Sequence, residues 1–432
     1  MAQAAALTRP RAHEPGGDAR WVRRVLLVWL GWAVLMLGFQ AWVQARYELK
    51  RPDTVMDWTA SWTSAGSAER HPYLQSPVMK GHAAWDSEFY ISIALHGYED
   101  PAMRAASPGS TPDAEVAAPK GTHPTWVSLN HAFFPGYPFA MALIARPLAA
   151  VGMPPVDAAT MAGVIVSILA ALFAVLAIAD LARGASEPDE DAGGNALRAG
   201  FYLAVWPAAV FLAQVYSESL FLAFSFGALA LIKRDRWGWA ALLAVAAVFT
   251  RATGVLLVIP FGVAWLGGGE RRTIPRAVLA AAPLIAYFAW RLFFGADFDF
   301  VETRYFGRWP FALGLSFEAW SDFLQTLASG VPQARAYELV ELAGIVASLV
   351  TSALLWRRDK GLTLYGLATF AVVALSGAAL GMHRYALAMP SMFLGPAYLG
   401  GRHPVFDRLW TLACVLGLAA LTLAFSFGFW AG

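Results

Sequence analysis

A succession of long apolar stretches constrains this chain more than any other feature of its sequence. They occur at about 22–44, 134–152, 157–182, 198–215, 218–232, 237–250, 254–268, 274–294, 336–356, 361–381, 385–400 and 407–431. A helix of about 20 residues crosses a bilayer, and about 17 residues suffice. Charged residues make up 14% of the chain, whereas soluble domains carry about 25%. The sequence therefore predicts an all-α polytopic membrane protein with a single integral membrane domain over 1–432.

Basic residues in the short connections predict how the bundle is oriented. Cytoplasmic loops are enriched in Lys and Arg, and basic clusters occur at 233–236, 267–276, 356–360 and 401–408. All of them fall on one side only if one early segment does not cross. The best candidate is 134–152, which is interrupted by prolines and is predicted to be a re-entrant or juxtamembrane helix. We therefore predict about 11 transmembrane helices, a cytoplasmic tail over 1–20 and an outward C-terminus.

Two sizeable segments are predicted on the outer side, a first outer loop at 45–133 and a second at 295–335. The first contains AAWDSEFYISIALHGYED, in which apolar residues recur every four positions. This spacing predicts an amphipathic helix near 86–97, lying along the outer membrane surface. Asp86 is then either the N-cap of that helix or a fixed carboxylate for catalysis. Glu88 is either a first-turn residue favoured by the helix dipole or a second catalytic group.

Two further stretches carry polar residues next to apolar segments. In NHAFFPGYP the prolines forbid a regular helix. This stretch is either an interfacial loop of aromatic residues or the floor of a lipid-binding cleft, where His131 would donate to a phosphate. In YSESLF a serine caps the following helix, or Glu218 lies at the outer mouth of a helix pair. A charge at that depth is costly unless it is solvated or used.

Several arginines are predicted on the outer side, where short loops are usually poor in Lys and Arg. They are Arg251, Arg291, Arg304, Arg308 and Arg384. Arginines at helix ends that extend to the membrane interface explain this pattern without any function. Several cations on one outer face also indicate a ligand that bears a phosphate.

The sequence gives little support to metal or nucleotide chemistry. Five of the eight histidines lie in the first outer loop, but none has the spacing of a zinc motif. No protein-built metal site is predicted, and a divalent cation shared by a carboxylate and a substrate phosphate is the one cofactor left open. The single cysteine forms no disulfide within one chain. Without a Gly-rich phosphate loop, a cytosolic nucleotide donor is not expected, and no nucleic-acid partner is predicted.

An outward carboxylate, outward arginines and broken helices together suit one reaction. This reaction is the transfer of a sugar from a lipid-linked phosphosugar to a hydroxyl group. The carboxylate would take the acceptor proton as general base. Arginines, or a metal ion, would stabilise the leaving polyprenyl phosphate.

A series of motifs also resembles a known family, the GPI mannosyltransferase II (PIG-V) family of the glycosyltransferase C (GT-C) superfamily. The motifs are, in this order, WDSEFYISIALHGYED, NHAFFPGYP, VYSESLF, TRATGVLLVIPF and HRYALAMPSMF. The resemblance covers roughly 20–400. It implies a GT-C-like membrane enzyme that transfers mannose from a polyprenyl-phosphate donor.

The resemblance also implies roles for particular residues. The candidate catalytic residues are Asp86, as general base, and Glu88, as its helper. The candidate donor-phosphate ligands are Arg384, Arg251, His131 and His383. The candidate substrate-binding residues are Trp85, Tyr137, Tyr216, Glu218 and Arg304.

Composition and alternatives complete the prediction. The Ala-, Arg- and Gly-rich sequence indicates a bacterial plasma-membrane protein with an outward site. A lipid, glycan or protein of the cell envelope is then the expected acceptor. The main rival is a transporter or flippase of a lipid-linked sugar, which the short helices and intramembrane polar residues favour. The long first outer loop and the lack of a visible paired repeat favour the transferase. A scaffold without activity leaves the outward arginines unexplained.

Overall fold

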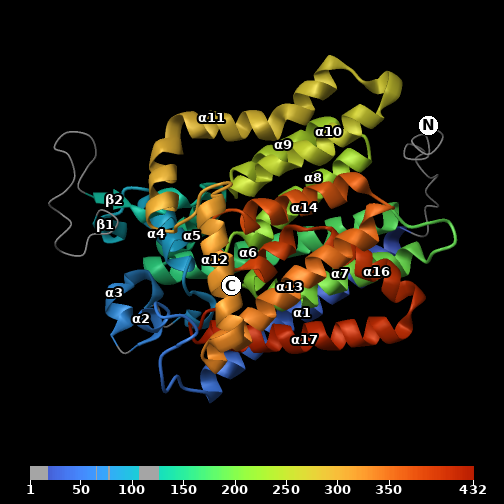
Figure 1. Cartoon of the computed structure of the whole chain (residues 1–432). Helices are drawn as coiled ribbons and strands as arrows, with labels where there is room; N and C mark the ends of the chain where they lie inside the picture. Colours follow the sequence, from blue (N-terminus) through green and yellow to red (C-terminus); the bar gives the residue numbers. More distant parts are fainter. Residues whose placement is uncertain (1–17, 65, 76–77, 107–125) are drawn as a thin grey trace.

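The computed structural model describes residues 18–64, 66–75, 78–106 and 126–432 of the chain. Within these ranges the protein is a bundle of helices with one two-stranded antiparallel ribbon (Figure 1). Most of the predicted cytoplasmic tail over 1–20 lies outside the described residues. The predicted class, an all-α polytopic membrane protein, is confirmed.

The helices and strands follow one another with short connections. The α-helices are α1 (Asp18–Arg46), α2 (Ala60–Thr63), α3 (Ser67–Arg70), α4 (Ser87–His96), α5 (Gly136–Ala150), α6 (Pro155–Gly184), α7 (Ala192–Val205), α8 (Glu218–Lys233), α9 (Trp237–Val248), α10 (Val258–Gly267), α11 (Ile274–Arg304), α12 (Leu313–Ser329), α13 (Pro332–Trp356), α14 (Lys360–Ala374), α15 (Met382–Tyr385), α16 (Ser391–Arg402) and α17 (Pro404–Ser426). The strands are β1 (Arg104–Ala106) and β2 (Trp126–Ser128). The 3-10 helices nearest the site are η6 (Leu129–Ala132), η7 (Pro207–Ala213) and η8 (Ala252–Leu257).

Five of the described helices are long and apolar enough to cross a membrane. They are α1, α6, α11, α13 and α17. A sixth crossing results if α7 and η7, which meet at an angle of 80°, are counted as one broken span. Shorter apolar helices occur at Trp237–Val248, Ala252–Gly267 and Lys360–Ala374. The predicted count of about 11 spans is therefore not confirmed by helix length and composition.

The break after α7 has a local cause. The sequence predicts one apolar segment at 198–215, but Trp206 adopts an extended backbone (φ −54°, ψ 140°) immediately before Pro207. Residues that precede a proline avoid the helical region, because the proline ring clashes with their backbone. The chain after η7 then leads through a buried turn to Glu218 at the start of α8. The broken helix thus delivers a carboxylate to the protein interior.

The basic connections gather at one end of the bundle, opposite α2, α3 and α4 (Figure 1). Ion pairs join these connections to one another and to nearby acidic residues. The pairs include Arg358–Glu190 at 2.6 Å, Arg402–Glu187 at 3.1 Å, Lys233–Asp359 at 2.5 Å and Arg276–Asp235 at 2.7 Å. The four clusters expected on one side of the membrane therefore lie on one side of the protein.

The predicted amphipathic helix near 86–97 exists as α4, but it does not lie along the surface. Its residues from Ser87 to Ile93 are all buried. α5 and α6 pack against it, and Tyr73 and Phe133, from the neighbouring connections, belong to the same apolar cluster. The period-four pattern reports one apolar face, whereas the surrounding loops also cover the other face of this helix.

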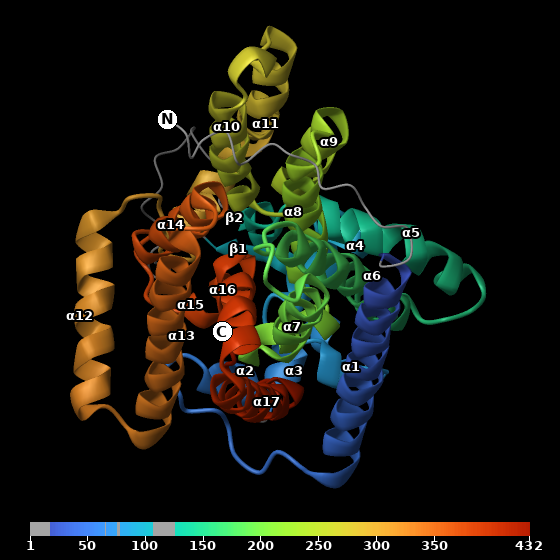
Figure 2. The same ribbon diagram turned by 90° about the vertical axis from the view of Figure 1, so that its right-hand side faces the viewer.

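The segment predicted as the second outer loop is mostly helical. α11 continues to Arg304, a turn follows, and α12 then forms a separate helix. α12 lies beside α13 at the edge of the bundle (Figure 2). The turn between α11 and α12 is the part of this segment that contributes to the site described next.

Candidate active site

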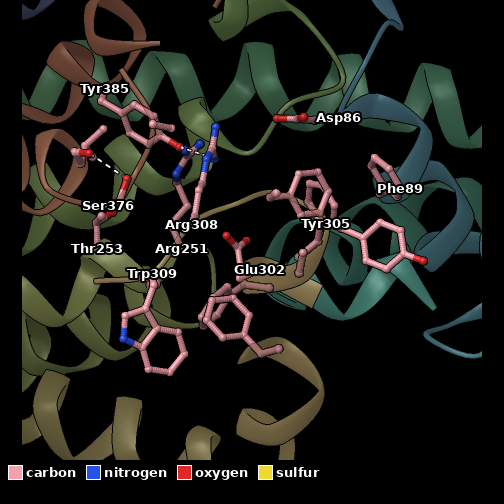
Figure 3. Close-up of a pocket in the computed structure, with 18 of the residues that line it drawn as sticks. Asp86, Phe89, Arg251, Thr253, Glu302, Tyr305, Arg308, Trp309, Ser376 and Tyr385 are labelled. Atoms are coloured by element: carbon pink, nitrogen blue, oxygen red, sulfur yellow. Dashed lines mark hydrogen bonds between the residues drawn. The ribbon is translucent and has the colours of Figure 1, made fainter. Parts of the chain in front are cut away.

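One cavity of about 890 Å³ lies where the early connections meet the later helices. It is lined by α4 and the turn before it, by η6, by the turn between α9 and η8, by α11 and the turn after it, and by the chain around α15. Arginines and aromatic side chains dominate its wall (Figure 3). The cavity therefore lies at the end of the bundle opposite the basic connections.

Asp86 faces this cavity instead of capping the helix that it precedes. It stands at the N-cap position of α4, but its side chain makes no capping hydrogen bond. Its Oδ2 accepts a hydrogen bond from Arg384 Nη2 at 2.9 Å. The preceding Trp85 adopts φ +53°, in the left-handed region, which is uncommon for a residue with a side chain. This strained turn points the Asp86 carboxylate away from the helix and towards Arg251 and Arg308 (Figure 3).

Glu218 lies between two of the predicted phosphate ligands. Its Oε1 is 2.6 Å from Arg384 Nε and 2.5 Å from Arg251 Nη1. With Asp86, these residues form a cluster of two carboxylates and two guanidinium groups. Burial lowers the pKa of Arg384, but Glu218 and Asp86 raise it further and hold it well above its ordinary value. Both arginines therefore enter the site as cations that are already paired.

Arg308 has a different environment from these paired arginines. It lines the cavity, and its Nη1 donates a hydrogen bond to the Tyr385 hydroxyl at 3.1 Å. Within the described part of the chain, no carboxylate lies within 4.0 Å of its guanidinium group. The carboxylate of Glu302, at the end of α11, points into the same space (Figure 3). A phosphate group would meet Arg308 without having to displace an acidic side chain.

Sequence reasoning grouped Arg308 with the outward arginines but did not select it, and it missed Glu302. Both residues lie in the segment predicted as a loop. A helix reaching Arg304 would have placed Asp299 and Glu302, three residues apart, on one face. In the structure both residues line the cavity, and Asp299 is paired with Arg291.

A cluster of tryptophans forms another part of the cavity wall. Trp58, Trp62, Trp85 and Trp430 all line it. The ring of Trp85 lies 5.7 Å from that of Trp58, 4.8 Å from that of Trp62 and 5.0 Å from that of Trp430, measured between centroids. Trp85, predicted to bind substrate, is thus part of the lining, although its own side chain is nearly covered.

Three other predicted residues lie behind the cavity wall. Glu88 is buried and pairs with His71 Nδ1 at 2.7 Å. The Tyr137 hydroxyl donates to the carbonyl oxygen of Gly163 at 2.9 Å inside the bundle. The Tyr216 hydroxyl is buried next to the site, where it accepts a hydrogen bond from the backbone N–H of Asp86 at 3.2 Å. None of the three lines the large cavity.

The remaining predicted residues are not brought into the cavity. His131 Nε2 lies 3.1 Å from Glu99 Oε1. His383 is buried and faces Glu341 at 2.9 Å. Arg304 is exposed at the end of α11 and is absent from the cavity lining. Of the four predicted phosphate ligands, only Arg251 and Arg384 line the cavity.

Metal-ion ligands are not grouped in the part of the chain that the structure describes. No three side chains of His, Cys, Asp or Glu lie there in an arrangement that could hold a metal ion. The charges that face the cavity are those of arginines and isolated carboxylates.

Comparison with solved structures found oligosaccharyltransferases of Archaeoglobus fulgidus. One is a complex with zinc and sulfate, with a TM-score of 0.42 and 14% identity, covering 95% of this chain and 53% of that protein. The other is a complex with an inhibitory peptide and a dolichol-phosphate, with a TM-score of 0.44 and 12% identity, covering 97% of this chain and 57% of that protein.

Sequence comparison confirms the predicted resemblance to PIG-V proteins. The family model described as Mannosyltransferase (PIG-V) matches residues 122–263. The mouse GPI alpha-1,6-mannosyltransferase 2 is 30% identical over 227 residues, which are 50% of this chain and 37% of that protein. The rat protein of the same name is 30% identical over 196 residues, 43% of this chain and 32% of that protein. The matched region thus spans little more than a third of these relatives. The family-model match includes Glu218 and Arg251 but neither Asp86 nor Arg384.

Proposed function

We propose that this protein transfers a mannosyl or other hexosyl residue from a polyprenyl-phosphate sugar to a hydroxyl group of a lipid, glycan or protein. The observation that carries the proposal is one cavity into which a carboxylate, Asp86, and four arginines face together. The likeness of the chain to PIG-V mannosyltransferases supports the choice of mannose.

In the proposed reaction Asp86 is the general base. The acceptor oxygen attacks the anomeric carbon of the donor sugar and gives its proton to the Asp86 carboxylate. The bond between the anomeric carbon and the phosphate oxygen breaks, and its electron pair leaves with the polyprenyl phosphate. Arg384, bonded to Asp86 at 2.9 Å, fixes the direction of that carboxylate. The chemistry thus needs one proton acceptor and one group of cations, and both face the cavity.

We assign the leaving phosphate to Arg308 first and to Arg251 second. Arg251 shares Glu218 with Arg384, so a phosphate would compete there with an existing carboxylate. Arg308 bonds only the neutral hydroxyl of Tyr385 among the side-chain contacts described. A guanidinium group binds phosphate oxygens through charge-assisted hydrogen bonds that are about twice as strong as neutral ones.

We further propose that the protein lies in a bacterial plasma membrane with the cavity at the outer face. The four basic connections occupy the opposite end of the bundle, and short basic connections stay cytoplasmic. A polyprenyl tail in the bilayer would then bring its phosphate to the level of the cavity mouth.

A direct transfer assay tests this function. The purified protein in lipid nanodiscs would receive polyprenyl-phosphate [³H]mannose and an extract of envelope lipids and glycans. Labelled product that requires the protein supports the transferase. Mass spectrometry of envelope glycolipids and glycoproteins, with and without the gene, would then identify the product that lacks one hexose.

The same material tests the rival flippase, which the broken α7–η7 span favours. In sealed vesicles a flippase would move the labelled lipid between leaflets without releasing the sugar from its phosphate. Translocation of intact donor with no labelled product would therefore replace the transferase proposal.

A further inference from the structure

We infer that Glu341 is a positioning residue, which holds the turn at 381–385 and thereby aims Arg384 at Asp86. The inference rests on the proposed function of the cavity, because Asp86 and Arg384 belong to that site. Glu341 lies on α13 and does not itself line the cavity. Its role would be to fix a segment of chain that contributes residues to the wall.

The carboxylate of Glu341 bonds this turn through both of its oxygens. Its Oε1 accepts the backbone N–H of Gly381 at 2.5 Å, and its Oε2 accepts the backbone N–H of His383 at 3.1 Å. His383 Nδ1 lies 2.9 Å from the same Oε2, and the Tyr337 hydroxyl donates to Oε1. Glu341 is completely buried. A buried carboxylate is tolerated only when it is paired and hydrogen-bonded, and these contacts meet that requirement.

The imidazole of His383 strengthens the attachment. Its Nδ1 faces Glu341, and its Nε2 lies 2.8 Å from the carbonyl oxygen of Ala431. Both ring nitrogens therefore face acceptors, an arrangement that favours the doubly protonated, cationic ring. Burial lowers the pKa of His383, but the Glu341 carboxylate raises it above its ordinary value overall.

α13 also fits this turn sterically. Gly344 lies three residues after Glu341, on the same face of the helix. A Cβ at Gly344 would lie 2.6 Å from His383 Cβ and 2.7 Å from His383 Cα. The helix and the turn are thus in close contact, and the hydrogen bonds of Glu341 act at that contact.

The opposite side of the turn faces the active site. Arg384 bonds Asp86 and Glu218, and Tyr385 accepts the hydrogen bond from Arg308. Residues next to each other in the turn therefore connect α13 to the acid and to the cations of the cavity. A shift of the turn would displace both groups at once.

Hydrogen–deuterium exchange on the purified full-length protein in nanodiscs tests the attachment without any substrate. In Glu341→Gln we expect exchange at the amides of Gly381 and His383 to rise about tenfold, the effect of weakening a charge-assisted hydrogen bond. The matched control is Glu338→Gln, which removes another buried carboxylate of α13 that makes none of these contacts. Tyr337→Phe keeps the carboxylate and should raise exchange about threefold, for loss of one hydrogen bond. Unchanged exchange at 381–385 in Glu341→Gln and Tyr337→Phe would overturn the inference.

A double-mutant cycle tests whether the attachment acts through Arg384. We expect Glu341→Gln to reduce sugar transfer about tenfold in the wild-type background. In the Arg384→Lys background the same change should reduce transfer less than about twofold. Equal losses in both backgrounds would show a merely structural role and refute the positioning. If the wild-type protein transfers no sugar, the proposed function fails, while the exchange experiment still decides whether Glu341 holds the turn.

Discussion

Replacing Arg308 by alanine gives the sharpest test of the donor site. Arg308 lines the cavity and has no carboxylate within 4.0 Å among the described residues. Its loss should therefore leave the ion pairs of the site intact and remove only contacts to the donor phosphate. A hydrogen bond to a charged group contributes about 1.5–3 kcal/mol, and about 1.4 kcal/mol corresponds to a factor of ten. We expect the donor KM to rise by about tenfold to a hundredfold.

The effect on folding should be small by comparison. In the structure Arg308 gives up one side-chain hydrogen bond, to the neutral hydroxyl of Tyr385. Such a bond contributes about 0.5–1.5 kcal/mol to stability. Arg308→Lys keeps the charge but not the planar fork of donors, so its donor KM should fall between those of the wild type and Arg308→Ala.

The assay varies the donor at saturating acceptor and measures initial rates in nanodiscs. Native mass spectrometry of bound polyprenyl phosphate provides a second readout that needs no turnover. Arg304→Ala is the matched control, because Arg304 lies four residues earlier, is exposed and stays outside the cavity lining. A donor KM within twofold of wild type for Arg308→Ala, or an equal loss for Arg304→Ala, would refute the assignment.

Three further predictions concern the carboxylates and the cofactor. Asp86→Asn should reduce transfer at least about a hundredfold with normal membrane insertion, because a general base contributes about 10²–10⁴-fold; wild-type turnover would remove Asp86 from the mechanism. Glu88→Gln, which breaks the 2.7 Å pair with His71, should lower the melting temperature of the protein but change kcat less than about threefold, and a larger loss of kcat at unchanged stability would return Glu88 to the site. Chelation by EDTA should leave transfer unchanged, since arginines face the cavity and Arg384 already pairs with Asp86; loss of activity that Mg²⁺ restores would instead show a divalent cation.

The position of the candidate base illustrates how far sequence reasoning reached. The motif around Asp86 and the helix after it were predicted correctly, with Ser87–His96 observed against an expected 86–97. Two readings of Asp86 stood open, a cap and a catalytic carboxylate. The structure gives no capping hydrogen bond and turns the side chain towards Arg384, which is 298 residues away in the chain.

Local chemistry accounts for what the sequence by itself determined. Hydropathy, proline positions and basic connections depend on residues close together in the chain. They predicted the membrane class, α4 and the gathering of the basic connections at one end. The partners of charged side chains depend instead on packing between distant segments. Only the tertiary structure therefore decided that Glu218 joins Arg251 to Arg384, that Glu88 faces His71, and that Arg308 is left to meet a ligand.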